Sequence, residues 1–254
     1  MSTPIGMFRE QFDVAFAYSP DLIETAYALR YQVYCEETRF EDPRQFPDRL
    51  ERDDYDDRSV HALVRHRPTD SFIGVVRLVL PDPGDPEVPF PIEKNCGDGL
   101  DRGVLRRAGA SRGAVAEISR FAVSKSLKRR VAHHAAGQSA PEAGPVQAAH
   151  GSDRNWLPHV TLGLFAGIVR LSADHGISHW YAVMEPTLMR LLTRFGVQFQ
   201  PIGPAVEYHG RRIPALACID ETLTSAYHRR RDVWDLVTEG GRLWPVDGPV
   251  PAVG

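Results

Sequence analysis

Acidic side chains and an arginine gather in the first quarter of the sequence, and together they could bind an amine. The segment ERDDYD carries carboxylates at Glu51, Asp53, Asp54 and Asp56, and Arg30 precedes it. Such a cluster can orient a cationic or amine substrate. Surface ion pairs in a solvated loop are the more common outcome, and they stabilise a protein little.

A second concentration of charge lies in the segment VAEISRFAV, residues 115–123, where Glu117 and Arg120 interrupt an apolar run. A buried strand rarely tolerates a charge without a partner. These residues are therefore either a structural ion pair at a sheet edge or part of a site. In a regular strand, residues three apart point to opposite faces, so both reach one site only if a β-bulge re-aims one of them.

Other catalytic patterns are missing from the sequence. The three cysteines, Cys35, Cys96 and Cys218, have no paired spacing, which argues against a disulfide framework or a zinc site. None of the ten histidines has metal-ligand spacing with a second histidine or a carboxylate, so we expect no bound metal. The sequence has no G-x-S-x-G elbow, no P-loop and no G-x-G-x-x-G after a strand. Nucleophilic hydrolysis and nucleotide chemistry are unsupported.

The length and composition are typical of one globular domain. The chain has 254 residues, of which 43% are hydrophobic and 25% charged. Its formal net charge of −3 gives no basic field for nucleic acid. No run of 18 apolar residues and no signal-peptide pattern occur, so we expect a cytoplasmic protein without a transmembrane segment.

Strand and helix patterns alternate along the chain, and they must position the charged residues. Strands are expected at residues 12–18, 60–65, 72–80, 115–123 and 177–183 and as a pair within 208–219. Helices are expected at residues 19–37, 155–174, 186–195 and 223–239. The acidic segment 40–58 reads as a long ordered loop, and 81–113 as an irregular connection. This order predicts an α+β fold, an α/β sandwich with helices on a mixed central sheet.

The composition changes abruptly at residue 124. Residues 124–155 begin with a basic cluster and continue as an Ala-, Gly-, Ser- and Pro-rich stretch, which predicts a mobile insert. We therefore expect one domain over residues 1–254, with a core at 12–222 and a C-terminal helix and tail at 223–254.

Four short segments occur in an order that resembles a known family. They are LRYQVYCE at 29–36, ERDDYD at 51–56, VRL at 76–78 and EISRF at 117–121. With the later segment 184–219, they resemble the acyl-homoserine lactone autoinducer synthases, a branch of the GNAT acyltransferase superfamily, over roughly residues 12–222. The sequence resembles in particular the long-chain N-acyl amino acid synthases and the PEP-CTERM/exosortase-associated acyltransferases. The implied fold is GNAT-like, with a mostly antiparallel sheet.

The resemblance implies roles for the acidic cluster and its arginines. Arg30 and Tyr34 match the helix arginine and aromatic residue that line the acceptor end of the family's site. Asp53 and Asp56 match its paired aspartates, one near the acceptor amine and one holding the arginine. Arg77 matches the strand arginine.

The resemblance also assigns the second concentration of charge to catalysis. Glu117 and Arg120 match the glutamate–arginine pair on the cleft strand, and Glu117 is the expected general base, directly or through water. We expect backbone N–H groups near residues 119–121 to stabilise the oxyanion. Phe40 stands where the family has a tryptophan that belongs to the S-adenosylmethionine pocket, and this departure disfavours that acceptor.

The remaining parts of the expected site are the groove for the acyl chain and the residues that bind the donor. Leu164, Phe165, Ile168 and residues 180–183 are expected to form the apolar groove. The Q/R-x-x-G-x-G/A loop that grips pyrophosphate in acetyl-CoA-dependent GNAT enzymes is absent after residue 123, which favours an acyl carrier protein over acetyl-CoA. Acyl-CoA stays open as the alternative donor. A basic cluster with Lys128, Arg129 and Arg130 either docks the acidic carrier or merely solubilises the insert.

These residues predict an N-acyltransferase that moves a fatty acyl group from a thioester carrier to a small amine, with no permanently bound cofactor. Two alternatives stay open. One is a lactone synthase that consumes S-adenosylmethionine. The other is a non-catalytic acyl-binding member of the fold.

Overall fold

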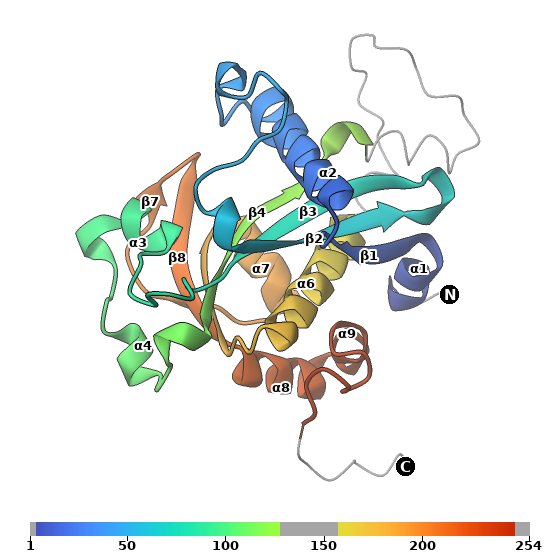
Figure 1. Cartoon of the computed structure of the whole chain (residues 1–254). Coiled ribbons are helices and arrows are strands. Elements are labelled where there is room, and N and C mark those ends of the chain that lie inside the picture. Colours follow the sequence, from blue (N-terminus) through green and yellow to red (C-terminus); the bar gives the residue numbers. More distant parts are fainter. Residues whose placement is uncertain (1–3, 128–156, 247–254) are drawn as a thin grey trace, which may run out of the picture.

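The computed structural model describes residues 4–127 and 157–246, which form a mixed sheet between helices (Figure 1). The strands are β1 (Phe12–Phe16), β2 (Ser59–His66), β3 (Ser71–Val79), β4 (Val115–Val123), β5 (His179–Met184), β6 (Gln200–Pro201), β7 (Val206–Glu207) and β8 (Arg211–Cys218). The helices are α1 (Pro4–Gln11), α2 (Pro20–Tyr31), α3 (Pro91–Asn95), α4 (Val104–Arg107), α6 (Leu157–Asp174), α7 (Pro186–Arg194), α8 (Ile219–Arg229) and α9 (Arg231–Val237).

The sheet has the order β1-β2-β3-β4-β5-β8-β6, and β7 pairs with β8. Only the β4–β5 pair in this sheet is parallel. The predicted sandwich with a mostly antiparallel, GNAT-like sheet is therefore confirmed.

Helices cover both faces of the sheet, and the apolar residues of each strand alternate between them. The long helix α6 packs across β1 to β4 on one face. It lies so close that a Cβ atom on Gly167 would stand 2.5 Å from the Cβ atom of Ala62. Helix α2 packs on the other face, against Leu63 and Val75 (Figure 1). None of the helices in the described segments is long and apolar enough to cross a membrane.

Strand β4 is irregular in its second half. Arg77 of β3 is paired with Ser119, but Val75 is paired with Ala122, so two residues of β4 oppose one residue of β3. This is a β-bulge, and Arg120 within it has a left-handed φ of 49°. On its other side, β4 pairs with β5 only as far as Ile118. The sheet therefore opens beside residues 119–123.

The predicted helix at 223–239 is two helices, and this prediction was wrong. The backbone breaks at Arg230, which has φ −146° and ψ 67°. Its guanidinium binds Asp232 at 3.0 and 2.9 Å, and its carbonyl accepts the N–H of Trp234. The helical spacing of apolar residues continues through the break and hid it. Helix α1 and strand β6 were also missed, and the predicted insert at 124–155 lies almost wholly outside the described residues.

Candidate active site

A cavity of about 290 Å³ opens where β4 separates from β5. Two sets of side chains line it. The polar set includes Tyr34, Glu41, Asp53, Arg77, Glu117, Ser119, Arg120 and His209. The apolar set includes Ile118, Phe121, Phe165, Ile168, Val183, Met184, Leu188, Leu192 and Phe199. A cavity that combines a polar wall with an apolar wall suits a ligand with a reactive head and a hydrocarbon tail.

Beneath the polar set lies a buried network that begins at Arg30. This arginine lies in the last turn of α2 and has no exposed surface. Its Nε atom donates to Glu51 at 2.5 Å, and its Nη atoms donate to both oxygens of Asp56 at 2.6 and 2.9 Å. The acidic loop is thereby fixed against the helix, since every charged atom of the arginine fork has a partner.

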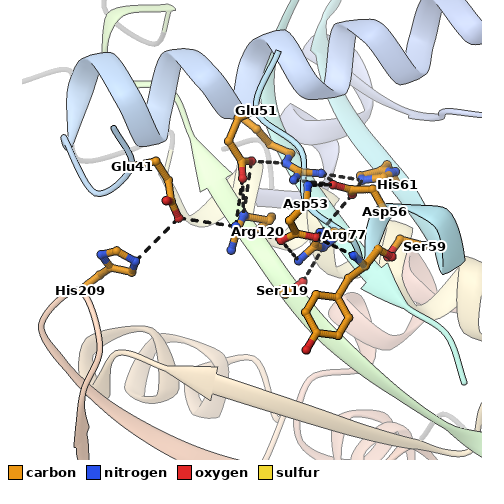
Figure 2. A network of polar contacts seen from close by, with 12 residues as sticks. Glu41, Glu51, Asp53, Asp56, Ser59, His61, Arg77, Ser119, Arg120 and His209 are labelled. Carbon is orange, nitrogen blue, oxygen red and sulfur yellow. Dashed lines mark hydrogen bonds and ion pairs between the residues drawn. The ribbon is translucent and has the colours of Figure 1, made fainter. Parts of the chain in front are cut away.

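Two further arginines connect this loop to the cavity (Figure 2). Arg77 donates to both oxygens of Asp53 at 2.6 and 3.1 Å and to Ser119 Oγ at 2.9 Å. Arg120 donates to Glu51 at 2.9 Å and to Asp53 at 3.1 Å. Asp53 therefore sits between two guanidinium groups from neighbouring strands, at the wall of the cavity.

The network carboxylates are held in their charged form. Although burial opposes ionisation, hydrogen bonds from His61 and Arg30 hold the pKa of Asp56 well below its usual range. The pKa values of Glu51 and Asp53 are lowered in the same way by their arginine partners. The side chains of Glu51 and Asp56 are 1% and 5% exposed. The interpretation of the ERDDYD segment as a solvated loop with surface pairs was therefore wrong for these residues.

Glu117 is buried in a different environment. Its side chain is 3% exposed, and its Oε2 atom accepts the backbone N–H of Ile92 at 2.8 Å. Burial raises the pKa of Glu117 to about 8, and the opposing effects of the Ile92 hydrogen bond and of Arg77 do not cancel this rise. A carboxyl group with such a pKa can accept and release a proton near neutral pH.

The bulge brings Glu117 and Arg120 to the same cavity, as a shared site required. The structure places four more predicted residues in the wall: Tyr34, Phe40, Asp53 and Arg77. Arg30 and Asp56 do not line the cavity, so the expected place of Arg30 at the acceptor end is corrected. Asp56 instead binds Arg30, the role expected for one of the two aspartates. Their side chains are enclosed, so we expect them to act by holding the acidic loop.

Glu41 and His209 were missed by the sequence analysis. Glu41 Oε1 lies 3.6 Å from Arg120 Nη2 and 3.8 Å from His209 Nε2 (Figure 2). His209 is in the turn between β7 and β8, where its ring stacks on Phe40 at 4.9 Å. Burial lowers the pKa of His209, which favours the neutral ring. A strand pair was expected within residues 208–219, but no local signal shows which loop the turn at His209 approaches.

The apolar set agrees partly with the expected groove. Phe165, Ile168 and Val183 line the cavity. Leu164 and Trp180 do not, because both are packed in the core, where the Trp180 indole donates to Ser172 Oγ at 2.8 Å. The rest of the apolar set was not expected to form the groove, and much of it comes from α7 and the segment after it.

Cys35 and Cys96 are poor nucleophiles in this structure. Burial raises the pKa values of Cys35 and Cys96 to about 11, so both thiols stay protonated at neutral pH. Within residues 4–127 and 157–246, no three histidine, cysteine or carboxylate side chains are grouped as metal ligands.

The polar groups of the residues directly after β4 bind a side-chain carboxylate of the same protein, that of Glu37. Glu37 accepts the hydroxyl of Ser124 at 2.7 Å, the N–H of Lys125 at 2.7 Å, and the N–H and hydroxyl of Ser126 at 3.2 and 2.8 Å. These hydrogen bonds outweigh burial and lower the pKa of Glu37. The predicted donor-binding residues Lys128, Arg129 and Arg130 lie outside the described residues.

Comparisons with known proteins agree with this geometry. Residues 29–136 match a family described as an acetyltransferase (GNAT) domain. TofI, solved in a ternary complex with an inhibitor and MTA, is 23% identical, with 85% of this chain and 96% of that chain covered and a TM-score of 0.58. No curated protein sequence matches the chain significantly.

Two further solved structures have the same fold. BjaI, a CoA-dependent acyl-homoserine lactone synthase solved with SAM and isopentyl-CoA, is 20% identical, covers 94% of each chain and has a TM-score of 0.55. FeeM, an N-acyl amino acid synthase from uncultured soil microbes, is 13% identical, with 85% of this chain and 94% of that chain covered and a TM-score of 0.53. The predicted resemblance to a GNAT-type acyltransferase is thus confirmed in domain match and fold.

Proposed function

We propose that this protein, whose residues 29–136 match the GNAT acetyltransferase domain, is an N-acyltransferase. It moves a fatty acyl group from a thioester donor to the amine of a small acceptor, an amino acid or a related amine. The observation that carries the proposal is Glu117: a buried carboxyl with a pKa of about 8, in the wall of a cavity that is polar on one side and apolar on the other.

In the proposed reaction, Glu117 removes a proton from the acceptor amine. The free amine attacks the thioester carbonyl carbon and forms the new carbon–nitrogen bond of a tetrahedral intermediate. The carbon–sulfur bond then breaks, and a second proton passes from the nitrogen to the thiolate, which leaves as a thiol, while Glu117 releases the first proton to solvent. Asp53 is the natural partner of the incoming ammonium group, because its side chain is 30% exposed whereas Glu51 and Asp56 are enclosed. Arg77 and Arg120 keep Asp53 charged and aimed at the cavity.

The β-bulge is the proposed oxyanion site. A bulge interrupts the hydrogen-bond ladder, so backbone N–H groups at Arg120 and Phe121 can turn from the sheet towards a ligand. Donors that are already fixed before the reaction stabilise developing negative charge most effectively. The apolar set beside the bulge would hold the acyl chain.

An acyl carrier protein is the preferred donor. The backbone amides of Lys125 and Ser126, directly after β4, already bind Glu37, so they do not offer a free anion site for a pyrophosphate. A carrier protein would instead dock through charge on the surface. Replacing Lys128, Arg129 and Arg130 together by Ala should then raise KM for an acyl carrier protein thioester.

The same triple replacement should leave turnover of a short acyl-pantetheine analogue nearly unchanged, because that donor needs only the cavity. Raising the salt concentration should weaken the wild type towards the variant, since screening acts over about 8–10 Å at physiological ionic strength. Equal KM values and equal salt responses would favour a long-chain acyl-CoA donor.

Mass spectrometry of lipid extracts tests the proposed function directly. Cells that express the wild type should accumulate an N-acyl product, and cells that express Glu117→Ala should not. Asp54→Ala is the matched control, because Asp54 is an exposed carboxylate of the acidic loop outside the cavity wall. A product that requires S-adenosylmethionine would identify a lactone synthase. No product from either protein, with fatty-acyl binding intact, would identify a non-catalytic member of the fold.

A further inference from the structure

The segment between β3 and β4 folds over the strand that carries Glu117, and Arg112 holds it in place. The Arg112 guanidinium lies over the buried ring of Phe90 at 5.3 Å, and its Nε atom donates to the carbonyl of Pro86 at 2.6 Å. Arg112 stands just before β4, five residues ahead of Glu117. Arg112 therefore links Pro86 and Phe90, in the first part of this segment, to the start of β4, the strand that carries Glu117.

The strongest contact of Arg112 is with Glu93 in α3. The two Nη atoms donate to the two carboxylate oxygens at 2.6 Å each, which is a bidentate pair. Glu93 Oε2 also accepts the backbone N–H of Phe90 at 2.8 Å. The side chains of both partners are less than one-fifth exposed. Together these bonds fix the first turn of α3.

That turn carries the one hydrogen bond that Glu117 accepts within the described part of the chain. The N–H of Ile92, the residue before Glu93, donates to Glu117 Oε2 at 2.8 Å. The other oxygen, Oε1, has no hydrogen-bond partner among residues 4–127 and 157–246, and the side chain lines the cavity. The Ile92 amide therefore sets the rotation of the carboxyl group and decides which oxygen is left for the substrate.

We propose that Arg112 is a positioning residue for Glu117, which acts through Glu93 and the Ile92 amide without touching the cavity. This inference rests on the proposed function for the role of Glu117 as base. Arg112 has two effects. It keeps the amide aimed at Oε2, and it neutralises the Glu93 carboxylate that stands near Glu117.

The charges around Glu117 predict the direction of each effect. Arg77 on β3 and Arg120 on β4 favour the ionised form, whereas Glu93 on α3 disfavours it. The remaining titratable neighbours, the Cys96 thiol and the Tyr181 phenol, are neutral, because burial raises both of their pKa values. Glu93 is therefore the neighbour whose charge Arg112 controls.

Opposite shifts are expected from the two partners of the pair. Arg112→Gln leaves Glu93 uncompensated and loosens the Ile92 amide, and both changes should raise the pKa of Glu117. Glu93→Gln keeps a side-chain oxygen that can accept the Phe90 N–H and hold the turn, but it removes the negative charge while Arg112 stays positive, so the pKa of Glu117 should fall. We expect roughly half a pH unit or more in each direction, since a nearby charge typically shifts a carboxyl by this amount or more.

The experiment is a titration of Glu117 by ¹³C NMR of glutamate-labelled protein. The Glu117 signal is assigned by its loss in Glu117→Gln. The acid limb of the kcat/KM profile is measured beside it. Arg65→Gln is the matched control, because Arg65 forms a comparable pair with Asp13 on the far side of the sheet. It should leave the Glu117 titration unchanged, and Arg112→Lys should recover part of the shift.

Shifts in opposite directions support the proposal, and shifts that are absent, or that have the same sign in Arg112→Gln and Glu93→Gln, overturn it. A merely structural role of Arg112 would lower the melting temperature and activity at every pH without moving the titration. The NMR titration does not require turnover. If the shifts occur but the wild type transfers no acyl group, the link from Arg112 to Glu117 stands and the proposed function fails.

Discussion

Glu117 at the cavity and Asp56 in the arginine network are two carboxyl groups with little exposed surface, and their pKa values are shifted in opposite directions. Glu117 is 3% exposed as a whole residue, and the side chain of Asp56 is 5% exposed. The pKa of Glu117 is raised to about 8, whereas that of Asp56 is held well below its usual range. Asp56 has Arg30, Arg77 and His61 as partners, whereas one backbone N–H reaches Glu117.

The comparison shows that burial does not decide the charge of a carboxyl group. Burial disfavours the ionised form of both groups, and the number of cationic partners decides whether that form is nevertheless the stable one at neutral pH. The charged carboxylates of the network thus hold the acidic loop, whereas Glu117 is poorly compensated, and we propose it as the group that transfers the proton. Each of the following changes tests this difference between the ionised network carboxylates and Glu117.

The largest effect is expected at the reactive carboxyl. Glu117→Gln keeps the shape of the side chain but removes the base, so kcat should fall by roughly 10²–10⁴. Steady-state kinetics with an acyl thioester measures this, and the KM for the donor should change little. A variant within twofold of the wild type would remove Glu117 from the mechanism.

A large effect on stability is expected at the structural carboxylates. Arg30→Met leaves Glu51 and Asp56 buried with fewer cationic partners, and the free energy of unfolding should fall by about 3–5 kcal/mol. Arg65, which is more exposed and pairs with Asp13 on neighbouring strands, is the control. Arg65→Met should destabilise the protein far less, because solvent screens an ion pair at the surface. Urea unfolding of the three proteins measures the difference, and equal losses would show that burial of the network contributes nothing.

An effect that is smaller for each pH unit, and that has a definite sign, is expected in the pH dependence of the free energy of unfolding. Because the pKa of Glu117 is higher in the folded than in the unfolded state, its contribution is full below the unfolded value and is lost as pH rises through about 8. Relative to Glu117→Gln, the wild type should lose about 1.4 kcal/mol per pH unit between roughly pH 5 and 8. Asp56 has the opposite sign, and its contribution is lost only as pH falls through its lowered pKa.

Urea unfolding of the wild type and Glu117→Gln at several pH values measures this slope. Parallel curves for the two proteins would contradict the raised pKa. They would also remove the contrast with Asp56, because both carboxyl groups would then be ionised at neutral pH.

Most of the fold could be predicted because its signals are local. The segment VAEISRFAV gave the bounds of β4, and the apolar spacing before Asp174 gave the end of α6. The break at Arg230 could not be predicted, because it depends on a backbone conformation that the apolar spacing on both sides conceals.

Without the family resemblance, which supplied Tyr34, Phe40, Asp53 and Arg77, site residues could be predicted only where a charged residue interrupts an apolar segment. Glu117 and Arg120 were found because they interrupt an apolar strand. Nothing local distinguishes buried Asp56 from exposed Asp54, two residues earlier in the same acidic segment. The approach of His209 to Glu41 joins distant parts of the chain and has no local signal at all.

The bulge in β4 also has a consequence for how such a site can be lost in evolution. The strand carries one residue more than β3 between their paired positions, so a deletion of one codon at Arg120 or Phe121 would restore a regular ladder. That deletion would relieve the left-handed backbone of Arg120 and turn the site's side chains away from the cavity. One in-frame deletion could therefore give a descendant that keeps the fold but no longer brings Glu117 and Arg120 to one cavity.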